Sequence, residues 1–184
     1  MYIKDGHPQM RISKQLITEG TLRLMGQYRF KDLTVTQICQ EAQIARRTFY
    51  RNYEYTIDIL EYYLDQMFET YLSEYYEPEQ NIANKLKCYF DFFLQHREFL
   101  MCIGRNNLFY LLKQTHERYM TEFLCNLDIV PYAVTRLKIN DYVSGFITST
   151  ICSNLAIWIS RNFETSSDIM AEMTEVFLSG LKKD

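Results

Sequence analysis

The sequence predicts an all-α protein. Apolar residues recur at the three- and four-residue spacing of a helix face along most of the chain, and no segment shows the alternation that is typical of a strand. Only 3 prolines and 6 glycines interrupt the 184 residues. Hydrophobic residues make up 47% of the chain, which is sufficient for a sizeable core in one compact unit or two small ones.

The first helix is expected at about residues 9–26, with Ile12, Leu16, Leu24 and Met25 among its inward residues. We expect it to brace the two short helices that follow it in the chain.

Residues 34–53 read TVTQICQEAQIARRTFYRNY and contain two short helical patterns joined by a turn of three or four residues. Thr34 and Thr36 can cap the start of the first pattern. A helix, a turn and a second, basic helix form the sequence pattern of a DNA-binding helix-turn-helix. The residues spaced to face inward are Val35, Ile38, Cys39, Ala42, Phe49 and Tyr53.

The outer side of the second pattern carries Arg46, Arg47, Tyr50 and Arg51. Arginine presents a rigid fork of donors that suits phosphate oxygens or the guanine edge in the major groove. A lone basic helix would more often be an ordinary solvated face. The preceding helix and turn favour the nucleic-acid interpretation.

The net charge of −3 hides a division along the chain. Through Tyr53 there are nine Lys and Arg against four Asp and Glu, a net charge of +5, and beyond it eleven against nineteen, a net charge of −8. This asymmetry is typical of a nucleic-acid-binding head on an acidic body, although chance unevenness in a soluble protein can also produce it.

These residues carry a family resemblance. The run 12–60 resembles the N-terminal DNA-binding domain of TetR-family bacterial transcriptional regulators, through Tyr28, the pattern Thr34-Val35-x-x-Ile38, the small-residue turn at 42–45, Thr48-Phe49-Tyr50, Tyr53, and the apolar pair Ile59 and Leu60. The resemblance implies a DNA-binding domain at 1–54 and a helical regulatory and dimerisation domain at 55–184. The DNA-contacting residues that we assign are Thr34, Thr36, Ala45, Arg46, Arg47, Thr48, Tyr50, Arg51, Tyr55 and Thr56.

The chain departs from the family pattern at three positions. Gln43 stands where many relatives have a glycine, so we expect a slightly strained turn with a positive φ. Thr56, between Glu54 and Asp58, stands where many relatives have a phosphate-contacting lysine. Arg47 replaces a residue that is often small and could compensate for that lysine.

After the motif, a helix is expected at 57–76, ended by Pro78, followed by helices at about 82–95, 97–104, 107–127, 132 or 138–161, and 167–182. Between Asp141 and Arg161 lie 19 uncharged residues, close to the length of a membrane span. Their many small polar side chains favour instead a helix packed between other helices or against a second copy.

The end of the chain resembles a branch of TetR-like proteins from Gram-positive bacteria, with Gly145 in an apolar helix and Trp158 near its end. This resemblance implies that the last two long helices form a four-helix bundle with those of a second subunit. Such a homodimer should prefer a palindromic double-stranded operator. The expected interface residues are Ile147, Ile151, Leu155, Trp158, Met170, Met173 and Phe177.

The middle helices are rich in aromatic residues and methionine, which mostly pack as core. If a pocket for a small apolar or aromatic effector exists, we expect it here, at Phe93, His96, Met101, Phe109, Tyr110, His116 and Tyr119.

Other classes of function lack support in the sequence. The 5 cysteines are odd in number and widely spread, which favours reduced thiols in the cytoplasm, and no secretory signal, metal-binding spacing, phosphate loop or nucleophile motif is present. We therefore expect no enzyme, cofactor or metal site. The sequence favours a homodimeric, cytoplasmic transcriptional regulator, in that family most often a repressor. The alternative is a helical small-molecule-binding or interaction protein that does not bind DNA.

Overall fold

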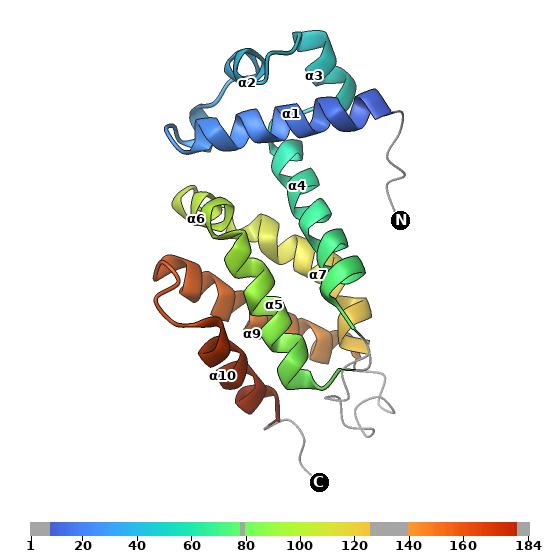
Figure 1. The fold of residues 1–184 in the computed structure, drawn as a ribbon, viewed down its shortest axis with the longest axis vertical. Helices are drawn as coiled ribbons and strands as arrows, with labels where there is room; N and C mark the ends of the chain where they lie inside the picture. The colour runs from blue at the N-terminus through green and yellow to red at the C-terminus, as the bar shows by residue number, and fades with distance from the viewer. Residues whose placement is uncertain (1–7, 78–79, 126–139, 180–184) are drawn as a thin grey trace. The chain divides into compact units, whose positions relative to one another are not determined.

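The structure, a computed structural model, describes residues 8–77, 80–125 and 140–179 (Figure 1). Every secondary-structure element in these ranges is helical, which confirms the all-α class. The chain divides into two compact units, Met1–Asp65 and Gln66–Asp184. The division falls inside helix α4 (Ile57–Thr70), whereas the sequence placed the domain boundary before this helix, at residues 54 and 55.

The first unit consists of α1 (Pro8–Met25), the short 3₁₀ helix η1 (Phe30–Asp32), α2 (Val35–Glu41), α3 (Arg46–Asn52) and the beginning of α4. Helix α1 packs against both α2 and α3, which also pack against each other. Each of these helices contributes a fully buried large apolar side chain: Ile17, Ile38 and Phe49. Burial of side chains this large supplies the main stabilisation of a small three-helix unit.

The inward face of α1 differs from the prediction. Ile12 and Leu16 are 58% and 41% exposed, and Leu24 is half-buried, whereas Met25 is buried as expected. The stripe that packs on the unit is instead partly polar, and the Thr21 hydroxyl donates to the backbone carbonyl of Ile17 at 2.8 Å. Apolar spacing alone therefore placed Ile12 and Leu16 on the wrong side of this helix. The remaining buried residues of α1 are Lys14, Ile17, Thr18 and Gly20.

The second unit begins with the end of α4, which continues into a π-helical segment, η2 (Tyr71–Tyr75). It then contains α5 (Ile82–Gln95), α6 (Arg97–Arg105), α7 (Phe109–Cys125), α9 (Asn140–Ser160) and α10 (Ser167–Ser179). Helix α10 packs along α5, and α9 packs against α7 and α6 (Figure 1). The predicted helices are thus all present. The predicted start of α9 at residue 132 or 138 and the predicted end of α10 at residue 182 lie outside the described residues.

Helices α6 and α9 end in the same way, without glycine. After α6, Asn107 has a φ of 57°, and Leu108 donates to the carbonyl of Ile103 at 3.0 Å. After α9, Asn162 has a φ of 53°, and Phe163 donates to the carbonyl of Trp158 at 2.9 Å. These are the hydrogen bonds of a Schellman motif, and the Phe163 ring packs on the Trp158 ring at 4.7 Å between centroids.

Helix α9 has one buried and one exposed side, although residues 142–160 carry no charge. Ile151 and Leu155 are buried, while Phe146 and Ile157 remain 58% and 53% exposed. In the part of the chain that the structure describes, no helix combines the length and the apolar content needed to cross a membrane.

Candidate nucleic-acid interface

The start of α2 is fixed by a capping box. The Thr34 hydroxyl oxygen accepts a hydrogen bond from the backbone N–H of Gln37 at 3.3 Å, and the Gln37 side-chain oxygen accepts one from the backbone N–H of Thr34 at 2.9 Å. These two bonds satisfy donors that the first turn of a helix leaves without partners. The cap predicted at Thr34 is therefore present, and Thr36 lies exposed in the first turn.

The turn between α2 and α3 is a Schellman motif with a strained residue. Gln43 donates to the carbonyl of Gln40 at 3.2 Å, and Ile44 donates to the carbonyl of Cys39 at 2.9 Å. Gln43 has a φ of 54°, which confirms the positive φ expected from the missing glycine. A non-glycine residue in this region costs about 1–2 kcal/mol, so the surrounding contacts hold the turn against strain.

Helix α3 separates its residues into two faces, as predicted. Phe49 is fully buried and Tyr53, which follows the helix, is 5% exposed; their rings lie 6.0 Å apart. The opposite side is open to solvent, with Tyr50 54% exposed. The predicted contact residues that are exposed are Thr34, Thr36, Ala45, Arg46, Arg47, Tyr50, Arg51 and Tyr55, while Thr48 and Thr56 are half-buried.

Two contacts hold α2 against α1. A Cβ atom at Gly20 would lie 3.1 Å from the backbone nitrogen of Ala42, closer than most Cβ contacts in proteins, so glycine favours this close approach of the two helices. On the surface, Arg23 Nε donates to a carboxylate oxygen of Glu41 at 2.6 Å. Helix α2 is therefore fixed at its end, next to the turn that leads into α3.

The loop between α3 and α4 is organised by Asp58. One of its carboxylate oxygens accepts hydrogen bonds from the backbone N–H groups of Glu54 at 2.9 Å and Tyr55 at 2.8 Å. These amides could otherwise bind an anion, as free amides at a helix N-terminus do. The start of α4 is thus acidic, and its backbone amides are already hydrogen-bonded within the loop.

Lys14 is a buried cation that sequence reasoning did not single out. It is 8% exposed, and its Nζ lies 4.1 Å from the centroid of the Tyr62 ring and 5.9 Å from that of Tyr53. A cation over aromatic faces is stabilised by their quadrupoles. This contact joins α1 to the end of α3 and to α4, and the aromatic residues at positions 53 and 62 were its only signal in the sequence.

The residues of the expected effector pocket do not all come together. Phe93 and His116 are buried and stack with centroids 5.6 Å apart, and Tyr119 stacks on Phe68 at 5.5 Å, next to them. Tyr110 is 51% exposed. The other three residues, His96, Met101 and Phe109, are half-buried.

His116 is held as a neutral ring inside this aromatic cluster. Its Nδ1 lies 2.8 Å from the carbonyl oxygen of Leu112, which can only accept, so Nδ1 carries the proton. The other ring nitrogen, Nε2, then accepts a hydrogen bond from the hydroxyl of Tyr89. Burial lowers the pKa of His116 to about 4, although the bond to Leu112 opposes this change.

Most of the residues expected at a dimer interface are buried in the core of the subunit itself. Ile147, Ile151 and Leu155 are at most 1% exposed. Trp158 and Met170 are buried as well, and the Trp158 Nε1–H donates to the carbonyl of Thr165 at 2.7 Å. Only the last two residues of the predicted set, Met173 and Phe177, face solvent, at 37% and 61%.

The thiols of Cys39, Cys88, Cys102 and Cys152 are free. Burial raises the pKa of Cys152 to about 12, so this thiol is neutral and packs as a small apolar group. Among the residues whose structure is described, no group of three or more His, Cys, Asp or Glu is placed to hold a metal ion.

No protein-family model matches the sequence, and no curated protein matches it. Two solved structures resemble the chain over most of its length. The dihydroxyacetone kinase operon activator DhaS has a TM-score of 0.65 and 17% identity, covering 92% of this chain and 96% of that one. A TetR-family transcriptional regulator from Streptomyces coelicolor has a TM-score of 0.61 and 16% identity, covering 91% and 81%.

The likeness identifies the fold. The chain is an all-α protein with an N-terminal helix-turn-helix unit followed by a helical bundle, as predicted. This is the fold of TetR-type transcriptional regulators, and both solved structures are named as regulators of transcription.

Proposed function

We propose that this protein is a sequence-specific, double-stranded-DNA-binding transcriptional regulator of the TetR family. The observation that carries the proposal is the two-faced α3: Phe49 anchors it in the first unit while Arg46, Arg47 and Arg51 stand in solvent. Such a helix can lie in the major groove with its cations toward phosphates and base edges. The capping box, the Schellman turn and the contact at Gly20 support the proposal, because a reading helix must be held rigidly.

Contacts to DNA are divided between helices α2 and α3 and the loop after them. We assign phosphate contacts to Thr34 and Thr36 at the start of α2, where backbone N–H groups favour anions. Arg47 takes over the phosphate contact that a lysine makes in many TetR relatives, because Asp58 already occupies the amides at the start of α4. Tyr50, at 54% exposure, is positioned for a base edge or a thymine methyl group.

We propose a homodimer whose interface is the solvent-exposed apolar side of α9 and α10, in place of most residues expected from the sequence. Exposed patches of this kind usually mark interaction sites. Two copies of α3 set about 34–36 Å apart would read a palindromic operator. The exposed apolar residues are Tyr142, Phe146 and Ile157 of α9 and Ile169, Met173, Val176 and Phe177 of α10.

We further propose that the protein is a cytoplasmic repressor controlled by a small apolar or aromatic effector. We place this effector at the aromatic cluster around Phe93, His116 and Tyr119, where its rings would replace contacts between the stacked side chains. An effector acts by binding one conformation more tightly than another. In transcription from a promoter that carries the bound site, added protein should lower transcript yield; a higher yield would identify an activator instead.

DNA binding is tested with a duplex selected from a random pool by the wild-type protein. Fluorescence anisotropy should give an affinity that falls steeply with salt, with a slope of roughly 0.9 per neutralised phosphate. Arg47→Ala and Tyr50→Ala should each weaken binding about tenfold or more, while circular dichroism shows an unchanged helical fold. Lys113→Ala, which removes an exposed cation from α7 in the second unit, is the matched control and should bind like the wild type.

The same experiment separates the alternatives. If no duplex is enriched, or if binding is weak and insensitive to salt, the protein is a helical small-molecule-binding or interaction protein, and the cations of α3 are an ordinary solvated face.

A further inference from the structure

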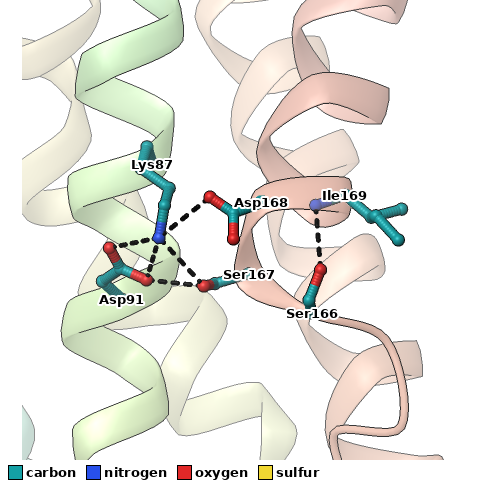
Figure 2. Close-up of polar contacts among 6 residues, drawn as sticks. All are labelled: Lys87, Asp91, Ser166, Ser167, Asp168 and Ile169. Atoms are coloured by element: carbon teal, nitrogen blue, oxygen red, sulfur yellow. Dashed lines mark hydrogen bonds and ion pairs between the residues drawn. The ribbon is translucent and has the colours of Figure 1, made fainter.

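The first turn of α10 is tied to α5 by a compact polar network (Figure 2). Lys87 Nζ lies 2.6 Å from both carboxylate oxygens of Asp91 and 3.2 Å from a carboxylate oxygen of Asp168. It also donates to the Ser167 hydroxyl at 3.2 Å, and this hydroxyl donates to Asp91 at 2.5 Å. Two residues of α5 therefore meet two residues of α10 that lie about 80 positions further along the chain.

The charges in this network are fixed by their mutual contacts. The hydrogen bond to Asp91 raises the pKa of Lys87, and Asp168 adds to the effect. Burial alone would raise the pKa of Asp91, but hydrogen bonds from Lys87 and Ser167 lower it below its usual value. Because Lys87 and Asp91 are four residues apart on one helix, their ion pair forms within α5 and does not require α10.

The contact between α10 and α5 combines an apolar part with the polar network. The side of α10 that packs inward presents Met170, Ala171 and Thr174, together with Leu178. Hydrogen bonds to ions are directional and short-ranged, so the contacts of Ser167 and Asp168 select one position.

The connection to α9 is fixed at the same end of α10. The Trp158 indole of α9 donates to the carbonyl of Thr165, immediately before α10, at 2.7 Å. The Ser166 hydroxyl accepts from the backbone N–H of Ile169 at 3.4 Å, which caps the helix. Figure 2 shows that the Ile169 side chain points away from Lys87, toward the exposed side of α10. The contacts at Thr165 and Ser167, two residues apart, therefore hold the start of α10 against both α9 and α5.

We propose that Lys87 and Asp91 are positioning residues for dimerisation: by holding the first turn of α10 they set the direction of its exposed apolar side, which a second copy of this chain can cover. This inference rests on the proposed homodimer. Neither residue need touch the second copy. Their role is to set the placement of Ile169, Met173 and Phe177, which do.

The test is a double-mutant cycle on the dimer dissociation constant of the full chain, measured by sedimentation equilibrium. Lys87→Met keeps the aliphatic stem and removes the cation, and Asp91→Asn keeps the shape and removes the anion. Each should weaken the dimer about fivefold or more, and the double variant should be no weaker than the weaker single variant, because both changes break the same network. Lys87→Arg should restore dimerisation to within about twofold.

Controls separate positioning from general damage. Lys113→Met removes the cation of an exposed i,i+4 pair on α7, with Glu117 at 3.7 Å, and should leave the dimer constant unchanged. Trp158 fluorescence should show that every variant keeps a folded second unit. Single variants that dimerise within twofold of the wild type, or a double variant that loses the product of the two single effects, would overturn the positioning role alone. A wild-type chain that stays monomeric at high micromolar concentration would overturn the dimer and the positioning role together.

Discussion

Acid should destabilise the second unit through His116, at pH values where most carboxylates are still ionised. The ring is buried against Phe68 and Phe93, with centroids 4.6 and 5.6 Å away, and accepts a hydrogen bond from Tyr89 at Nε2. A proton added at Nε2 would place a charge in this apolar cluster and turn the acceptor into a donor. Unfolding releases the ring to water, where protonation carries no such penalty.

The size and sign of the effect follow from the pKa of His116, which burial lowers from 6.5 to about 4. Between these values the unfolded chain binds a proton that the folded chain does not, so the free energy of unfolding falls as the pH is lowered. The full contribution is present above pH 6.5. Over this interval the free energy of unfolding falls by about 1.4 kcal/mol per pH unit, so the loss approaches ~3 kcal/mol near pH 4.

Trp158 provides the assay, because it is the single tryptophan, lies in the second unit and is 2% exposed. Urea unfolding followed by its fluorescence should give a stability that declines between pH 6.5 and 4 in the wild type. In His116→Gln, which has no group that titrates there, the decline should be much smaller. The contribution of Asp91, whose pKa is lowered below 3.8, appears only at lower pH.

His96 is the matched control. Burial lowers its pKa as well, but the ring is only half-buried and its contribution over the same interval should be small. His96→Gln should therefore retain most of the decline seen in the wild type. If His116→Gln and the wild type lose stability in parallel, His116 does not remain neutral in the folded protein, and the argument from its burial is refuted.

Substitutions at three positions test the helix-turn-helix unit, each measured by urea unfolding with far-ultraviolet circular dichroism, while Trp158 fluorescence should report an unchanged second unit. Gln43→Gly should stabilise by about 0.5–1 kcal/mol, since glycine relieves a φ of 54° but loses more chain entropy; a loss of stability would mean that the turn is not strained. Thr34→Ala should destabilise by about 1 kcal/mol through the lost cap, and Thr34→Ser should not; equal effects would exclude the hydroxyl as the cause. Gly20→Val should destabilise by about 1–3 kcal/mol, because its side chain would press on the backbone of Ala42, and an unchanged stability would show that α2 can move away freely.

The helix-turn-helix could be predicted well because its determinants are local. The capping residue, the turn position that requires a positive φ and the burial of Phe49 each depend on residues within one or two helical turns. The contacts that hold the helix-turn-helix against α1 and α4 were harder to predict. Lys14 is a charged residue on a helix, which ordinarily means exposure, and only the rings of Tyr53 and Tyr62 from other helices make its burial stable.

The sequence by itself determined the class of fold, the order of the helices and which side of α3 faces solvent, because a period of 3.6 residues marks one side of a short amphipathic helix. It could not determine the exposed side of α9, because apolar and small polar residues are distributed around this helix without marking one side. Ile151 and Phe146 are equally plausible as core, and only packing on α6 and α7 buries the first and leaves the second in solvent. The contact of Lys87 with Ser167 was likewise decided by the tertiary structure alone. No local pattern encodes a hydrogen bond between residues 80 positions apart, which forms only when α10 has folded back along α5.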